Sequence, residues 1–369
     1  RRISQVFFLL LFLWFCLVSA MGTSWWQLRG WPVNWFLELD PLIGISTLLT
    51  TGKVYAGLAW GLLTLVLTIV FGRVFCGWVC PFGTLHQFIG YLSRRKTRVS
   101  EKLWDNLYRP AQSIKYYILF FLLTVAVGSL AVRVFTLPRS APLTSGIVAI
   151  VVILIVAVWR AGKTSPKKWV IGIIATGFFW VLVSFLFRSD DRFSASLQIG
   201  LLDPIALMHR SINLIVLPLL DATNLKLSAA QRLYEGSWLI GAVFITTLLL
   251  NLLIPRFYCR FICPLGALLG LFSRYSLWRI GKRSTDCPEC ELCQKNCEGA
   301  CSPTDEIRLA ECVMCLNCLD DCRHGLMTYQ RQSSAAGEIV TPDLTRRGLV
   351  TTLVSGAVTL PVLGISALT

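Results

Sequence analysis

Cysteine spacing constrains this chain more than any other feature of its sequence. Of its 14 cysteines, only Cys16 lies outside four clusters. Two clusters have the spacing C-x2-C-x2-C-x3-C, which is typical of thiolates that bind [4Fe–4S] clusters and differs from the paired hooks of zinc sites. These runs comprise Cys287, Cys290, Cys293 and Cys297, followed by Cys301, and then Cys312, Cys315, Cys318 and Cys322. The spacing therefore predicts iron–sulfur ligation rather than disulfide bonds.

The two runs predict two [4Fe–4S] clusters with exchanged ligands. In two-cluster ferredoxins, the first three cysteines of a run bind one cluster and the fourth binds the other. The predicted ligands are Cys287, Cys290, Cys293 and Cys322 for one cluster, and Cys312, Cys315, Cys318 and Cys297 for the other. Neither fourth cysteine is followed by the usual proline, and Cys301 is an alternative to Cys297 or Cys322. Four nearby carboxylates are expected to be solvated: Glu289, Glu291, Asp320 and Asp321.

Composition predicts an integral membrane protein. Of the 369 residues, 55% are hydrophobic and 15% are charged, whereas a soluble domain has about 25% charged residues. The mean hydropathy is +0.64. A net charge of +15 would indicate nucleic-acid binding in a soluble protein, but here the basic residues gather at the ends of apolar stretches. Membrane topology explains that distribution, so we expect contact with membrane lipid and no nucleic-acid partner.

Apolar stretches predict about seven transmembrane helices. Their ranges are 5–21, 54–72, 114–132, 146–159, 169–187, 237–254 and 348–367. Seven alternating spans place every basic flank on one side of the membrane, which the positive-inside rule assigns to the cytoplasm. The cysteine-rich segment then lies in the cytoplasm as well, where thiols stay reduced. The predicted fold is an all-α integral membrane protein with a small ferredoxin-like two-cluster domain.

An internal repeat organises the predicted spans. The tripeptide LDP occurs at 39–41 and 202–204, and each copy precedes a span that leads to Cys-x3-Cys-Pro. Both halves run in the same sense, which predicts a parallel repeat about an axis along the membrane normal, with LDP in outer loops. The predicted domains are 1–93 and 169–279 for the two halves, 94–168 for basic loops and a central hairpin, 280–335 for the two-cluster domain, and 336–369 for the last span.

The cysteine pairs of the two halves are expected to meet at the cytoplasmic face. They are Cys76 and Cys80 in the first half and Cys259 and Cys263 in the second. Three interpretations stay open: four thiolates bind a further iron–sulfur cluster, each pair is a redox-active dithiol, or all four are small buried hydrophobic residues. Members of a pair share a helix face if the span continues through them. Three basic residues either offset thiolate charge or mark the interface: Arg73, Arg256 and Arg260.

The remaining candidates carry weaker signals. His86 and His209 are predicted near opposite membrane faces, so they are not expected to share a haem, and His209 beside Arg210 is a candidate contact for a quinone head group. Arg346 and Arg347 before the last span fit a twin-arginine export signal or an ordinary basic flank. The sequence contains no dinucleotide fingerprint or P-loop. No catalytic residue is predicted, because the clusters would carry the redox chemistry.

Taken together, these motifs resemble the NapH/NosR type of polyferredoxin-like membrane iron–sulfur protein. The resemblance covers 73–83 and 256–322. It implies an electron-transfer subunit of an oxidoreductase in the bacterial inner membrane, which links the quinone pool to a periplasmic reductase or its cofactor-supplying machinery. Other redox subunits are then expected partners. NosR-type proteins carry a flavin-bearing domain before their spans, which this sequence does not show, so no flavin is expected. The related CcoG-type proteins suggest the alternative of a metal-reducing maturation or redox-sensing protein.

Overall fold

The computed structural model describes residues 1–21, 32–51, 56–94, 98–134, 200, 202–221, 237–285, 287–288 and 290–364. These ranges include all 14 cysteines. The chain forms two compact units: unit 1 comprises 1–45, 54–119 and 200–344, and unit 2 comprises 46–53, 120–199 and 345–369. The cysteine-rich segment thus shares unit 1 with both Cys-x3-Cys-Pro motifs. The domain boundaries expected from the sequence stay a prediction.

Two helices in the described ranges are long and apolar enough to cross a membrane, α1 (Arg2–Met21) and α7 (Ile114–Val134). Three other predicted spans coincide with α4 (Leu58–Phe71), α13 (Ser237–Leu253) and α18 (Arg346–Gly364). The spans predicted at 146–159 and 169–187 lie outside the described residues. Seven membrane-spanning helices are therefore not confirmed.

Helices α4 and α13 are shorter than the spans predicted for them. The 14 residues of α4 cover about 21 Å at 1.5 Å per residue, less than the ~30 Å hydrocarbon core of a bilayer. Helix α4 ends at Gly72, whose φ of 78° lies in the left-handed region that favours glycine. Helix α13 ends just before Pro255, which cannot donate a backbone hydrogen bond.

Short helices follow the long ones in both halves of unit 1. The first half contains α2 (Trp35–Glu38), α3 (Pro41–Thr51), the π-helical turn η2 (Phe75–Val79), α5 (Pro81–Arg94), α6 (Val99–Asp105) and the 3₁₀ turn η3 (Pro110–Ser113). The second contains α11 (Pro204–Ser211), the π-helical turn η4 (Ile212–Val216), α12 (Leu217–Asp221), α14 (Phe257–Phe261) and α15 (Pro264–Ser273).

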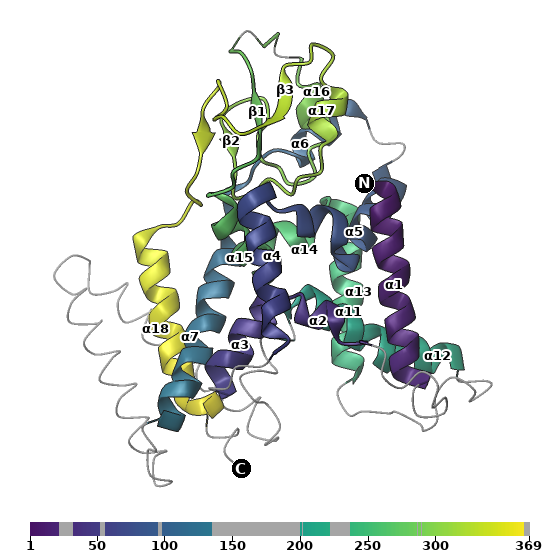
Figure 1. Ribbon diagram of the computed structural model, residues 1–369, viewed down its shortest axis with the longest axis vertical. Helices are drawn as coiled ribbons and strands as arrows, with labels where there is room; N and C mark the ends of the chain where they lie inside the picture. The colour runs from purple at the N-terminus through teal and green to yellow at the C-terminus, as the bar shows by residue number, and fades with distance from the viewer. Residues whose placement is uncertain are drawn as a thin grey trace, which may run out of the picture. The chain divides into compact units, whose positions relative to one another are not determined.

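The two LDP motifs lie inside the helical part of unit 1. Helices α2 and α11 pack against each other and lie part-way along α1, α4 and α13 (Figure 1). Asp40 and Asp203 are fully buried, and the Thr64 hydroxyl of α4 donates to the Leu39 carbonyl at 2.8 Å. The prediction that LDP occupies outer loops was wrong, because each motif starts a helix whose first turn is packed among other helices.

The cysteine-rich segment forms a small α+β layer at one end of these helices (Figure 1). Strand β1 (Arg279–Lys282) pairs antiparallel with β3 (Met327–Gln330), and β2 (Ile307–Arg308) pairs parallel with β4 (Glu338–Ile339). Two short helices, α16 (Leu292–Lys295) and α17 (Asn317–Asp321), carry the third cysteine of each run. Glu291 and Leu316 start these helices with φ of 53° and 61°, so the same left-handed turn recurs.

Unit 2 contains α18 and the second part of α7. Gly356 of α18 lies against α7, where an added Cβ would approach the Thr124 Cβ to 2.9 Å and the Phe121 carbonyl to 3.2 Å. Glycine allows this close helix–helix approach, as in other apolar helix pairs.

Candidate iron–sulfur sites

Four cysteines from both runs line one hollow in the cysteine-rich segment. This outer set consists of Cys287, Cys290, Cys293 and Cys322, and it is the group that the ferredoxin rule assigns to one cluster. Cys290 is exposed, whereas Cys293 is buried. Burial opposes ionisation of Cys322, but backbone N–H groups between His324 and Met327 outweigh it and hold the pKa of Cys322 below its ordinary value. The outer set thus reaches the protein surface at Cys290.

The inner set consists of five buried cysteines. They are Cys297, Cys301, Cys312, Cys315 and Cys318. The Cys301 Sγ lies 3.5 Å from the Cys297 Sγ and is also hydrogen-bonded to Cys312. These bonds lower the pKa of Cys297 and Cys312 and raise the pKa of Cys301. Cys301 therefore lies with the inner set, where it is an alternative to Cys297 as the fourth ligand. Cys322 lines the outer hollow instead.

The arrangement of these thiols fits clusters better than single ions. In the described residues, no three Cys, His, Asp or Glu side chains converge to hold one metal ion. A cubane does not need such convergence, because each cysteine binds a different iron and the four sulfurs surround the cluster. The outer set surrounds a hollow, and the inner set supplies mutually interacting sulfurs from 297 to 318. Both sets thus fit the four-thiolate requirement of a [4Fe–4S] cluster.

The four-cysteine site consists of Cys76, Cys80, Cys259 and Cys263. Cys80 and Cys263 adopt nearly the same backbone angles, with φ and ψ of −62° and 116° for Cys80 and −59° and 109° for Cys263. Each directly precedes a proline that opens a helix, where the missing N–H costs no hydrogen bond. The Sγ atoms accept the backbone N–H of Gly83 at 3.4 Å and of Gly266 at 3.1 Å. The two motifs therefore build the same local structure.

The structure brings the two cysteine pairs together. Cys80 and Cys263 each interact electrostatically with Cys76 and Cys259, and all four thiols are free. A shared helix face was expected if each preceding long helix continued through its cysteine pair. The long helices do not continue that far. Cys76 lies in the π-helical turn η2 instead, where the Cys80 N–H bonds to the Phe75 carbonyl at 2.9 Å. This turn separates the cysteines from α4 and aims them toward the second half.

Three buried arginines surround the candidate sites, and they differ in what they bind. Arg73 donates to the Ala310 carbonyl at 2.8 Å and approaches the Cys76 Sγ at 3.9 Å. Arg256 donates to the Cys76 carbonyl at 3.3 Å. Arg260 instead binds the carbonyls of 105 and 107 and the Gln112 side chain. Arg73 and Arg256 are thus placed to offset thiolate charge at the four-cysteine site, whereas Arg260 ties α14 to the loop before α7.

Main-chain atoms of the second cysteine run, residues 312–322 and here called the inner run, pack directly on the four-cysteine site. A Cβ on Gly77, between Cys76 and Cys80, would lie 2.4 Å from the Val313 carbonyl oxygen, so only glycine fits there. The Trp78 indole N–H donates to the Met314 carbonyl at 3.0 Å. The chain that carries Cys312 and Cys315 therefore lies against the turn that carries Cys76.

The buried Glu311 and the partly buried Glu298 secure this contact, and little in the local sequence marks either of them. Glu311 precedes Cys312 and pairs with Lys115, while the Tyr116 hydroxyl donates to it at 3.0 Å. Glu298 follows Cys297 and pairs with Arg1 at 2.7 Å and Arg256 at 2.8 Å. Burial opposes ionisation of both glutamates, but these cations outweigh it and hold the pKa of each below its ordinary value. The only sequence signal was Glu298 in place of the usual proline.

The carboxylates singled out from the sequence have other surroundings. Glu291 and Asp320 are exposed, as expected, whereas Asp321 is half-buried and accepts from the Asn296 amide at 2.9 Å. Glu289 lies outside the described residues.

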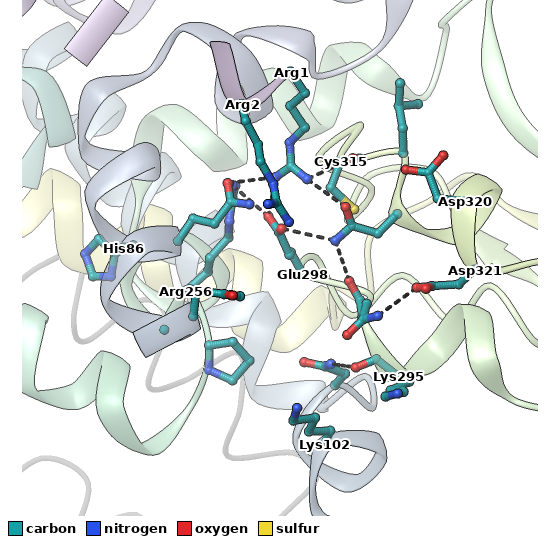
Figure 2. Close-up of a pocket in the computed structure, with 18 of the residues that line it drawn as sticks. Arg1, Arg2, His86, Lys102, Arg256, Lys295, Glu298, Cys315, Asp320 and Asp321 are labelled. Carbon is teal, nitrogen blue, oxygen red and sulfur yellow. Dashed lines mark hydrogen bonds and ion pairs between the residues drawn. The ribbon is translucent and has the colours of Figure 1, made fainter. Parts of the chain in front are cut away.

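A cavity of about 870 Å³ lies beside the inner set (Figure 2). Arg1 and Arg256 converge on Glu298 in its wall, and the Arg1 guanidinium donates to the Cys315 carbonyl at 2.9 Å (Figure 2). The charged residues that line it are Arg1, Arg2, Lys102, Arg256, Lys295, Glu298, Asp320 and Asp321. The excess of basic groups suits an anionic molecule or a negatively charged partner surface.

The two histidines considered from the sequence do not meet. His86 lies at the edge of the cavity (Figure 2). Its ring stacks on Tyr258, with the ring centroids 6.3 Å apart. His209 packs edge-on against Phe12 and lies 3.1 Å from the Asn213 amide. Neither arrangement identifies a quinone site.

Known proteins match the parts of the chain that carry these sites. The family described as "4Fe-4S binding domain" matches 54–100 and 236–284, which contain the two halves of the four-cysteine site. YccM of Escherichia coli, whose name describes an electron transport protein, is 23% identical over 330 residues, which cover 87% of this chain and 69% of YccM. The resemblance to NosR-type iron–sulfur proteins is confirmed.

Two further relatives carry this resemblance. The regulatory protein NosR of Pseudomonas aeruginosa is 23% identical over 323 residues, which cover 81% of this chain and 31% of NosR. Protein NirI of Paracoccus denitrificans is 43% identical over 70 residues, or 18% of this chain and 10% of NirI. The chain thus spans less than a third of NosR. No solved structure matches it significantly. The chain is thus similar to YccM, NosR and NirI, and two of its segments match a 4Fe-4S binding family.

Proposed function

We propose that this chain is a membrane-bound electron carrier with three iron–sulfur centres in series. The outer set and the inner set each hold a [4Fe–4S] cluster, and the four-cysteine site holds a third centre. When bound, such clusters supply one-electron transfer. The observation that carries the proposal is the direct packing of the inner run on the four-cysteine site, where the Val313 carbonyl occupies the space above Gly77.

The protein's own residues have defined roles in this scheme. Arg73 and Arg256 place positive charge at Cys76, which favours thiolates in a buried setting. Glu298 and Glu311 hold the inner run against the helices. Of the alternatives for the four-cysteine site, small buried hydrophobic residues fit least well, because such residues need no buried guanidinium beside them.

The proposed path has one end at the protein surface and the other among the helices. Exposure of Cys290 favours the outer set as the place of exchange with a soluble donor or a redox partner subunit. We place this end in the cytoplasm and the four-cysteine site at the inner face of a bacterial membrane, from the distribution of basic flanks. Seven spans, a parallel repeat and a quinone or quinol reaction partner belong to the same proposal.

The count of iron and acid-labile sulfide tests the third centre. Two cubanes alone give about eight irons, and a further cluster raises the count to about ten to twelve. We expect Cys80→Ser to lower the count in anaerobically purified protein. Cys16→Ser is the matched control, because Cys16 is a buried cysteine of α1 outside all four clusters. An iron count that Cys80→Ser leaves unchanged would remove the third centre.

A second function rests on the printed names of the relatives, which include both an electron transport protein and regulatory proteins. In that case the clusters sense redox state or reduce a metal during maturation of another protein. Faster cluster oxidation or reduction on addition of quinone or quinol would favour the electron-transport function. Reduction of a metal ion without any dependence on quinone would favour the second.

A further inference from the structure

A second symmetric pair of side chains lies in unit 1, apart from the cysteines. Asp40 and Asp203 are the aspartates of the two LDP motifs, and both are fully buried. The Asp40 Oδ1 accepts the backbone N–H groups of Leu42 at 2.8 Å and Ile43 at 3.4 Å. The Asp203 Oδ1 accepts those of Ile205 at 2.9 Å and Ala206 at 3.2 Å. Each aspartate therefore uses one oxygen to cap the helix that follows it.

The second oxygens have no donor from any other described group. Both Oδ2 atoms are buried without a hydrogen-bond donor, and the two carboxyl groups interact electrostatically with each other. Ionised carboxylates only accept hydrogen bonds, so neither aspartate can donate to the other unless one of them carries a proton. Two buried carboxylates in contact also cannot both be ionised at low cost. We therefore expect the pair to hold one proton and one negative charge.

The ionisable groups around the pair come from a few elements. Arg210 of α11 interacts with Asp203. Tyr258 of α14 donates its hydroxyl to the Leu202 carbonyl and interacts with Asp203 as well. Cys80 and Cys263 of the four-cysteine site lie within electrostatic range of Asp203. Helices α4 and α13 contain no titratable side chain. The pair is thus a buried acid with the basic side chain of Arg210 in electrostatic range, and it lies within electrostatic range of the proposed third centre.

We propose that Asp40 and Asp203 form a proton-binding site coupled to the four-cysteine site. The inference rests on the proposed third centre. One electron that reaches this centre from the inner set is accompanied by one proton from water, which binds to the carboxylate that is still ionised and neutralises the pair. On oxidation, the electron leaves and the same O–H bond breaks. The buried region then gains no net charge, which matters because charge is costly far from water.

Infrared difference spectra between the oxidised and reduced protein test the coupling. We expect bands in the carboxylic-acid C=O region that shift in D₂O and disappear in Asp40→Asn and in Asp203→Asn. Asparagine keeps the capping oxygen and offers an N–H where the proton lay, so both variants should fold. Asp305→Asn is the control, because it removes one negative charge from an exposed position and should leave the bands unchanged.

The reduction potential of the centre gives a second readout. A tenfold change in proton concentration converts to about 59 mV for a fully coupled one-electron step. We expect the potential to fall with rising pH in the natural protein and to depend less on pH in both asparagine variants. A full iron count with no carboxylic band would overturn the coupling alone. An iron count of only the outer and inner clusters would overturn the third centre and the coupling with it.

Discussion

The outer and inner sets use the same cysteine spacing and the same left-handed turn before their third cysteine, yet their surroundings differ. The outer set opens to solvent at Cys290, whereas all five sulfurs of the inner set are buried. The inner run is also held by Glu298 and Glu311, which pair with cations outside the cysteine-rich segment. Spacing therefore determines which cysteines lie together, whereas packing determines whether they face solvent or other parts of the protein.

Removal of Glu311 should destabilise the inner set, which is held by ion pairs, more than the outer set, and it should lower stability more than any other change considered below. Glu311→Ala leaves Lys115 buried without its partner, which should lower the free energy of unfolding by about 3–5 kcal/mol. We expect a lower melting temperature in detergent and loss of the inner cluster signal before the outer one. Asp305→Ala, at an exposed position of the same segment, should change stability by no more than about 0.5 kcal/mol. Equal melting of both variants would contradict the role given to Glu311.

The contact between the inner run and the four-cysteine site can be broken with one methyl group. In Gly77→Ala, the added Cβ would lie 2.4 Å from the Val313 carbonyl, and such overpacking costs about 1–3 kcal/mol. Gly90→Ala is the matched control on α5, since its Cβ would meet nothing closer than 3.6 Å and alanine favours a helix by up to ~1 kcal/mol. In thermal unfolding, Gly77→Ala should melt at a lower temperature than the parent protein and Gly90→Ala at a higher one.

A serine exchange sharpens the assignment of the inner ligands. The ferredoxin rule favours Cys297 as the fourth ligand, so Cys297→Ser should lose about four irons and Cys301→Ser should keep them. The outer cluster should persist in both variants, because neither cysteine lines its hollow. Iron analysis with electron paramagnetic resonance would show which signal disappears. The reverse pattern would make Cys301 the ligand.

The smallest expected effect is a dependence on pH. The pKa values of Glu298 and Glu311 are held below their ordinary range, so both glutamates bind fewer protons in the folded state. Their contribution to stability is complete above about pH 4.3, the usual carboxyl pKa, and is lost as the pH falls through the folded values. Glu311→Gln should weaken this acid loss, whereas Glu306→Gln, at an exposed position, should keep it.

Local sequence patterns were enough to predict which cysteines come together. The spacing of Cys287, Cys290 and Cys293 keeps them close along the chain, and the ferredoxin rule added Cys322, which lines the same hollow. The internal repeat likewise predicted that Cys80 and Cys263 would meet. The structure brings these cysteines together because each grouping depends on short-range geometry or on a repeated local structure, while their role as cluster ligands stays a prediction.

Features that depend on packing between distant segments were not predictable in the same way. Glu311 meets Lys115 almost 200 positions away, and nothing in either local sequence marks the pair. Asp40 and Asp203 were assigned to loops, because the repeat showed that they correspond but not that both motifs turn inward.

The Val313 carbonyl against Gly77 is a contact between two main chains, one from each of two proposed redox regions. Side chains can change rotamer or be exchanged by mutation, but a peptide carbonyl seated on a glycine leaves no adjustable group between the two. The distance that an electron would cross here is therefore set by the packing of two backbone segments. Transfer between these regions should tolerate drift in the surrounding side chains as long as that one position stays without a Cβ.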